Sequence, residues 1–264
     1  MAYVSESDQA VSVITSGSVV AIGGSVNAGA PMRLVSSLIR SGATNLTIVG
    51  GMTGTLALDF LIASGCVSKI ICPYVGNPEV SPVGPAFRFS ALNGEIEIEE
   101  TDEGVHLVAL RAAAAGLPFG VWRASVGTSL PDLNSGIELL EENGRAYFKV
   151  APLHIDVALL WAPRGSRHGD IAWWRVSLGD IELAHAAGHR IVQVDQITDD
   201  PVTLLDARNF SSSLADVVVV APEGPFPFAG PKNDLDLEFL RSYARSKNLN
   251  DCKSFVKEHF GAAQ

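Results

Sequence analysis

The chain has 264 residues, 47% of them hydrophobic, which is enough to bury a sizeable core. Its formal net charge of −10 and the lack of any lysine and arginine stripe argue against a nucleic-acid partner, because such binding depends on neutralising phosphates. The first residues lack the basic start and apolar run of a secretory signal, and no apolar stretch approaches the ~18 residues of a membrane span, so we expect a cytoplasmic protein that binds no membrane.

The cysteines and histidines show no spacing typical of a metal site. Cys66, Cys72 and Cys252 form no CxxC pair and are odd in number, so neither a disulfide scaffold nor a zinc site is expected. His185 and His189 stand four residues apart without an HExxH pattern, and we expect them to decorate the end of a helix. We therefore expect no bound metal ion.

The first part of the chain alternates between short apolar runs and helical segments. We expect strands at 19–22, 46–49, 69–72 and, with half-exposed alternation, 95–99, and helices at about 31–40, 56–63 and 85–92. Continuous apolar strands separated by helices predict a parallel sheet that is covered on both faces.

Residues 102–115 are expected to form a helix that is apolar on nearly every side and therefore buried. Asp102 can cap its first turn, and Glu103 stands where the helix dipole favours a negative charge. A strand is expected to follow at 119–122. A carboxylate fixed at the head of this helix, in the same segment as His106, is a candidate catalytic group. The alternative is that Asp102 and Glu103 only cap a core helix.

The second half of the chain continues the alternation. After a loop-like stretch at 127–144, we expect strands at 157–161, 190–194 and 217–220, and helices at 178–188 and 235–247. No internal repeat, low-complexity tract or polar linker divides the sequence. We therefore expect a single domain, residues 1–264, with C-terminal helices from about 232 to 261.

Two glycine-rich stretches each follow a predicted strand and precede a predicted helix. Glycine amides at such a place can approach an anion closely, while the alternative is a tight turn at the end of a strand. Neither stretch has the GxGxxG spacing or a GK[ST] P-loop, so no dinucleotide or nucleoside triphosphate is indicated. Two such loops after neighbouring parallel strands would place donors where ligands bind and where a thioester oxyanion needs them. The candidate binding residues are Gly23, Gly24 and Asn27 in the first loop, and Gly50 and Gly51 in the second.

Several short motifs, spread over roughly residues 10 to 240, form one pattern. The central motifs lie in and directly after the helix expected at 102–115, which we call the signature helix. They are Glu103-Gly104, Leu110-Arg111-Ala112-Ala113, Ala115-Gly116-Leu117-Pro118-Phe119 and Val126-Gly127-Thr128. The others are Gly23-Gly24 with Gly29-Ala30-Pro31, Leu46-Thr47-Ile48-Val49, Asp156-Val157-Ala158-Leu159-Leu160 before Gly169-Asp170, and the run 216–224. This pattern resembles the A (alpha) subunit of family I coenzyme A transferases, of the glutaconate CoA-transferase type. Asp102-Glu103-Gly104 is also similar to the alpha subunit of a steroid-ring-cleaving CoA-ester hydrolase of the same fold.

The resemblance implies an α/β fold: a single domain with a mostly parallel sheet flanked by helices, of the CoA-transferase (NagB/RpiA-like) type. It implies a heterotetramer with a beta subunit that acts on an acyl-CoA and a small carboxylic or dicarboxylic acid. A glutamate of the beta subunit would attack the acyl-CoA, form a glutamyl-CoA thioester and pass coenzyme A to the acid. This chain would supply pocket walls and oxyanion donors. Coenzyme A would be a substrate, with no tightly bound cofactor.

Two other interpretations stay open. The same fold can serve a CoA-ester hydrolase that cleaves a carbon ring, or a decarboxylase, with Glu103 as the general base, a role that suits a buried carboxylate. In either enzyme, Arg123 is a candidate partner for a substrate carboxylate, because we expect it after the strand 119–122 at the carboxyl edge of the sheet and a guanidinium matches a carboxylate bidentately; its alternative is a structural salt bridge. A non-enzymatic, metabolite-sensing subunit is the third interpretation.

The remaining motifs concern the second subunit. Glu141-Glu142-Asn143-Gly144 resembles the run that holds the nucleophilic glutamate of the beta subunit, but it follows the signature helix and lacks a glycine-rich continuation. We expect it to be a turn between two strands. We expect the apolar stretch 222–231 to form a patch that the second subunit covers. Trp173-Trp174 could belong to the same kind of patch or line a pocket, and their alternative is packing in the core.

Overall fold

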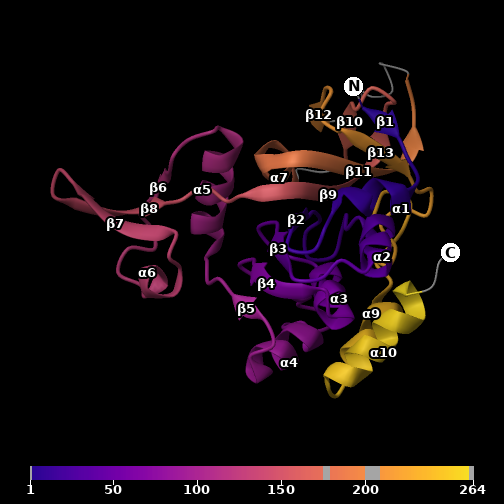
Figure 1. Cartoon of the computed structure of the whole chain (residues 1–264), viewed down its shortest axis with the longest axis horizontal. Coiled ribbons are helices and arrows are strands. Elements are labelled where there is room, and N and C mark those ends of the chain that lie inside the picture. Colours follow the sequence, from indigo (N-terminus) through magenta and orange to yellow (C-terminus); the bar gives the residue numbers. More distant parts are fainter. Residues whose placement is uncertain (1, 175–178, 200–208, 262–264) are drawn as a thin grey trace.

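The computed structural model describes residues 2–174, 179–199 and 209–261. The strands of its main sheet are β1 (Tyr3–Val4), β2 (Val19–Ile22), β3 (Leu46–Gly50), β4 (Val67–Ile71), β5 (Glu97–Ile98), β9 (Ile155–Gly165), β10 (Ile171–Trp173), β11 (Ala187–Ile197), β12 (Asn209–Ser211) and β13 (Val217–Val220). They run in the order β1-β13-β11-β9-β2-β3-β4-β5, and each neighbouring pair on this path is parallel. β10 and β12 add antiparallel pairs beside β9. This order confirms the predicted mostly parallel sheet (Figure 1).

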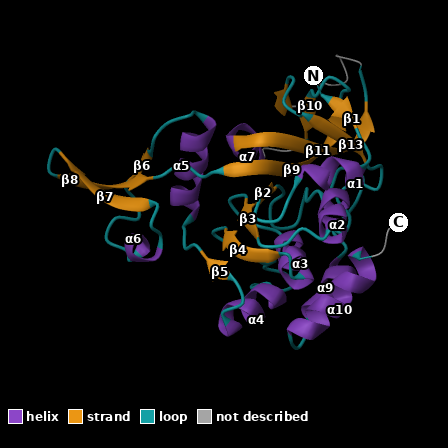
Figure 2. Cartoon of the chain, viewed as in Figure 1, coloured by secondary structure: helices purple, strands orange, loops and turns teal. Residues whose placement is uncertain are grey.

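Helices cover both faces of this sheet (Figure 2). One face is covered by α1 (Ser7–Ala10), the short 3-10 helix η1 (Val11–Val13), α2 (Met32–Ser41), α3 (Leu56–Ser64), α4 (Pro85–Asn93), α9 (Leu237–Ala244) and α10 (Leu249–Phe260). The opposite face is covered by α5 (Glu103–Ala114) and α7 (Asp180–Ala186).

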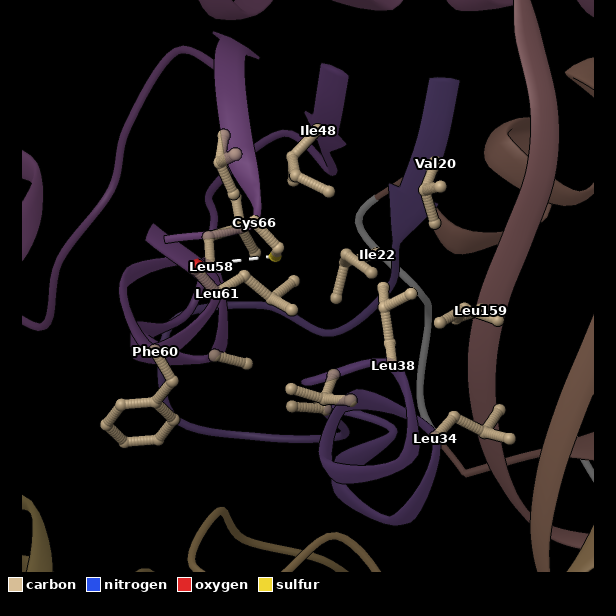
Figure 3. Close-up of a cluster of buried hydrophobic side chains, with 14 of the residues drawn as sticks. Val20, Ile22, Leu34, Leu38, Ile48, Leu58, Phe60, Leu61, Cys66 and Leu159 are labelled. Carbon is tan, nitrogen blue, oxygen red and sulfur yellow. Dashed lines mark hydrogen bonds between the residues drawn. The ribbon is translucent and has the colours of Figure 1, made fainter. Parts of the chain in front are cut away.

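Side chains alternate between the two faces along each strand. Val20 and Ile22 of β2 pack with α2 and α3, as Figure 3 shows. Ala21 between them packs in the opposite cluster with Leu110 of α5 and Leu183 of α7. Because both faces are buried, the strands appear in the sequence as continuous apolar runs rather than as alternating ones.

A buried carboxyl group ties the C-terminal helices to the core. Asp59 of α3 accepts hydrogen bonds from the Tyr243 hydroxyl of α9 at 2.5 Å and from the backbone amides of Ala86 at 3.0 Å and Phe87 at 2.7 Å in α4. Burial raises the pKa of Asp59 to about 6, although these three hydrogen bonds act in the opposite direction. One side chain thus holds three helices together.

A second, smaller sheet projects beyond α5 as an arm (Figure 1). The arm consists of β6 (Gly120–Trp122), α6 (Leu130–Leu133), β7 (Ile137–Glu142) and β8 (Arg145–Val150), and its strands pair antiparallel in the order β6-β8-β7. The predicted turn at Asn143-Gly144 is confirmed, since it joins β7 to β8 and both residues have positive φ, 51° and 71°.

Several details of the prediction were wrong. The strand before Arg123 lies in the arm and not in the main sheet, and the stretch expected to be a loop contains α6 and β7. Helix α5 is not buried on every side, because Glu103 and Arg111 are exposed. For Trp173 the alternative of core packing holds, since it is 4% exposed and its indole donates to Ser211 Oγ at 3.0 Å. The expected helix at 178–188 begins with residue 178 outside the described residues.

No helix in the described part of the chain is both long enough and apolar enough to cross a membrane.

Candidate active site

The loops that follow the parallel strands meet at the carboxyl edge of the main sheet. The loop after β2 bonds to the loop after β3, where the Val26 amide donates to the Thr53 carbonyl at 3.3 Å. It bonds to the loop after β4 through Asn77, whose amide group donates to Asn27 Oδ1 at 2.5 Å. It also accepts from the loop after β13, since the Ala229 amide donates to the Asn27 carbonyl at 2.8 Å. This edge is where open α/β sheets bind ligands.

The first glycine loop is held by its amide groups. The Gly23 amide donates to the Leu159 carbonyl at 2.9 Å, and the Gly24 amide donates to Oδ1 of Asp180 at 2.9 Å. Gly24 has φ = 97°, and a Cβ there would lie 2.8 Å from the Ala30 nitrogen. Glycine is therefore required at position 24 by the fold itself. Both amides predicted to face a substrate already have partners within the chain.

A strained turn forms the tip of this loop. The Ser25 amide donates to the Ala28 carbonyl and the Ala28 amide to the Ser25 carbonyl, each at 2.9 Å. Val26 at the corner has φ = 47°, which is unfavourable for a β-branched residue. The Asn27 side chain, bonded to Asn77, extends from the same turn towards Glu79, with 3.4 Å between its Nδ2 and Oε1 of Glu79. The predicted binding residue Asn27 therefore joins two loops.

The second glycine loop is held by a carbonyl group. The Gly50 carbonyl accepts a hydrogen bond from Nε2 of His106 at 2.9 Å. A Cβ at Gly50 would collide with Cys72 Sγ and lie 2.9 Å from Leu58 Cδ2, so no side chain fits here. His106 is 1% exposed, and burial lowers its pKa. The signature helix α5 therefore reaches the end of β3 through this one imidazole.

Glu103 begins α5 but does not cap it. The cap is Asp102, whose Oδ1 accepts from the Val105 amide at 2.7 Å while its other oxygen accepts from the Ser125 hydroxyl. The Glu103 side chain is exposed, and no hydrogen bond or ion pair joins it to any described residue. Glu103 lies three positions before His106 and thus on the same side of the helix. The expectation of a buried carboxylate was wrong for this chain alone, and the capping alternative applies to Asp102.

Arg123 lies near the same end of α5. The preceding residue, Trp122, packs its indole against Gly104, where a Cβ would collide with the ring. The indole also donates to Ser125 Oγ at 3.0 Å, and that hydroxyl contacts Asp102. Arg123 is exposed and has no ion pair with the described residues. The structure therefore brings Glu103 and Arg123 to one end of α5 without pairing them.

Polar residues that the sequence analysis did not single out support this edge. Asp195 at the end of β11 is 5% exposed and accepts from the Trp161 indole at 2.8 Å, and burial raises its pKa. Gln193 accepts from the Arg33 amide at 2.9 Å and donates to the Gly224 carbonyl at 2.8 Å. The signal in the sequence is the polar alternation Gln193-Val-Asp195 within an apolar strand. For Asp180 the signal is a carboxylate directly after a glycine at a helix start.

Across residues 2–174, 179–199 and 209–261, no three histidine, cysteine or carboxylate side chains are grouped so that they could hold a metal ion.

Comparison with known proteins identifies similar chains. The sequence profile of the family described as "Coenzyme A transferase" matches residues 4–220. The IpdA subunit of the cholesterol ring-cleaving hydrolase of Rhodococcus jostii is 32% identical, over 97% of this chain and 91% of its own length. The A subunit of the 3-oxoadipate CoA-transferase of Pseudomonas putida is 34% identical over 72% of this chain and 80% of its own. The crystal structure of glutaconate coenzyme A-transferase from Acidaminococcus fermentans superposes with a TM-score of 0.92 at 28% identity, covering 100% of this chain and 90% of that one.

Proposed function

This chain belongs to the coenzyme A transferase family, and from that premise we propose that it is the A subunit of a two-subunit CoA-transferase. The enzyme transfers coenzyme A from an acyl-CoA to a small carboxylic or dicarboxylic acid. Coenzyme A is a substrate in this reaction, and no tightly bound cofactor is needed. The proposal places the enzyme in the cytoplasm; the free thiols of Cys66, Cys72 and Cys252 fit a reducing compartment.

The observation that carries the proposal is the convergence of two glycine loops and the head of α5 at one edge of the sheet. In acyl transfer, a carboxylate attacks the thioester carbonyl and negative charge develops on the carbonyl oxygen. The attacking glutamate is expected on the beta subunit. The second glycine loop of this chain would then supply backbone donors to that oxygen, and Arg123 would pair with the carboxylate of the accepting acid.

The arm supports the need for a second subunit. Val121 and Leu139 of the arm are 47% and 60% exposed, and Leu117 at its base is 52% exposed. Large apolar side chains grouped on one projection are typical of a surface that a partner covers. We propose that the beta subunit covers this surface and completes the active site.

A second candidate function is hydrolysis of a CoA ester. It is favoured by the 32% identity to the hydrolase subunit over nearly the whole chain, and by the free carboxylate of Glu103. On this proposal Glu103 takes a proton from water, and the water attacks the carbonyl carbon of the substrate.

Product analysis tests the proposal and separates it from this alternative. The chain is co-expressed with its beta subunit, and the purified complex is incubated with an acyl-CoA, with and without an acceptor acid. A transferase forms a new CoA ester only with the acceptor, while a hydrolase releases product with water alone. Full turnover by the isolated chain would contradict the two-subunit proposal.

A further inference from the structure

The hydrogen bond between His106 and Gly50 determines both the tautomer of the imidazole ring and the orientation of the Gly50–Gly51 peptide. A carbonyl oxygen can only accept, so Nε2 of His106 must carry the hydrogen, and this determines the tautomer of the ring. The contact joins residues 56 positions apart and is buried. It is the link by which the signature helix holds the end of strand β3.

Holding a carbonyl also orients the next amide. The peptide between Gly50 and Gly51 is planar, so a fixed carbonyl directs the Gly51 N–H to the opposite side, away from His106. Gly50 cannot shift freely, because Leu58 and Cys72 pack against its Cα. On the other side of the loop, a Cβ at Gly179, at the head of α7, would lie 3.3 Å from the Met52 nitrogen. The second loop is thus confined between α5 and α7.

We infer that His106 is a positioning residue for the reaction at this edge: it holds the Gly50–Gly51 peptide so that the Gly51 N–H donates to the thioester oxygen as negative charge develops there. This role rests on the proposed function and applies equally to transfer and to hydrolysis, because both pass through an oxyanion. The same helix carries Glu103 one turn before His106, on the same side of the helix.

The surroundings of the ring keep it neutral. Burial lowers the pKa of His106, against the opposing effects of its hydrogen bond to the Gly50 carbonyl and of the charge of Glu99, which forms an ion pair with Lys69 at 2.7 Å. Nδ1 of His106 is buried and has no hydrogen-bond partner among the described residues. His106 lines a cavity of about 60 Å³, together with Thr101 and Asn134. This cavity has room for water that could donate to Nδ1, which leaves Nε2 as the donor to Gly50.

Two amide variants of His106 separate positioning from packing. In His106→Gln the terminal amide nitrogen can occupy the place of Nε2 and donate to the Gly50 carbonyl. In His106→Asn the amide is one bond shorter and cannot reach it. Both variants keep a polar side chain in the cavity, so their difference reports on the hydrogen bond. Tyr243→Phe is the matched control, because it removes another buried donor far from the edge.

The measurement is kcat, KM and melting temperature of the assembled complex with an acyl-CoA. We expect His106→Asn to lower kcat by about 10- to 10²-fold with little change in KM, since the lost interaction is made in the transition state. His106→Gln should recover most of this loss, and Tyr243→Phe should lower the melting temperature with kcat intact. Equal kcat for wild type and His106→Asn, or an equal loss in both amide variants, would overturn the inference while leaving the proposed function standing. A wild-type complex that turns over no CoA ester would overturn the proposed function, and with it this role.

Discussion

The two glycine loops at the carboxyl edge have similar sequences but are held in opposite ways. In the first loop the amides of Gly23 and Gly24 are both donated to groups within the chain. In the second loop the carbonyl of Gly50 is held, by His106. In the first loop, the amides that could donate to an oxyanion already have acceptors within the chain. In the second loop, the held carbonyl of Gly50 orients the Gly51 amide. On the proposed function, the first loop contributes to stability and the second loop takes part in the reaction.

The difference also shows what decides the role of a glycine loop. The anchors, Asp180 and His106, come from the two helices on the same face of the sheet, α7 and α5. A carboxylate in the first case accepts from an amide, and an imidazole in the second donates to a carbonyl. The side chain opposite the loop, rather than the glycine content, determines which backbone group faces a ligand.

The largest expected effect concerns Glu103, which lies one turn before His106 in α5. Glu103→Gln keeps the size of the side chain but removes its charge and its ability to take a proton. If the reaction at the second loop uses Glu103 as general base, kcat of the assembled complex should fall by roughly 10²–10⁴-fold, with the melting temperature unchanged because Asp102 still caps α5. Asp102→Ala should show the reverse, a loss of about 1 kcal/mol of stability. If Glu103→Gln has the kcat of wild type, Glu103 is not a general base and only the transferase proposal remains.

The pH dependence of stability should be determined in part by Asp59, which lies outside both glycine loops. The pKa of Asp59 is raised from 3.8 to about 6 in the folded chain, so the folded state holds this proton more tightly than the unfolded state does. This contribution to stability is complete below pH 3.8 and is lost as the pH rises to about 6, a change of about 3 kcal/mol. Urea unfolding of wild type and Asp59→Asn between pH 4 and 7 measures it. Parallel curves for the two proteins would contradict the assignment.

The anchor of the first loop should affect stability more than rate. Asp180→Ala leaves the Gly24 amide without its acceptor, and an unsatisfied buried donor costs about 1–3 kcal/mol. We expect a lower melting temperature, with kcat close to that of wild type well below that temperature. A large loss of kcat at an unchanged melting temperature would place the first loop in the reaction and break the distinction between the loops.

The smallest expected effect concerns the tip of the first loop. Val26→Gly relieves the unfavourable φ of 47° and adds some backbone freedom to the unfolded chain. We expect a net gain of about 1 kcal/mol in the free energy of unfolding, measured by denaturant titration. A loss of stability would show that the Val26 side chain contributes more by packing than its backbone costs.

Much of the main sheet could be predicted because its local signals agree with the final structure. The apolar runs at β2, β3 and β13 are buried on both faces, and glycines with positive φ, such as Gly42 and Gly65, end the helices between strands. The arm could not be predicted in this way. β7 reads Ile-Glu-Leu-Leu-Glu-Glu, in which exposed apolar and charged residues mix without a clear period.

Of the candidate site, only the glycines and the carboxylate of Glu103 could be predicted from the sequence. The positions of Gly24, Gly50 and Glu103 at one edge follow from strand order and helix starts. Their hydrogen-bond partners do not, because Asp180 lies 156 residues from Gly24 and His106 lies 56 residues from Gly50. Local sequence patterns carry no information about such distant pairs.

The distinction between the two loops is tested most directly by one comparison of single-site variants. Gly24→Ala and Gly51→Ala are measured in the assembled complex for kcat with an acyl-CoA and for melting temperature. We predict that Gly51→Ala lowers kcat by about 10²-fold in a complex that still assembles and melts like wild type. Gly24→Ala should instead lower the melting temperature, with kcat of the folded complex nearly intact. The opposite pattern, with kcat lost in Gly24→Ala and unchanged in Gly51→Ala, would contradict the assignment of the second loop to the reaction.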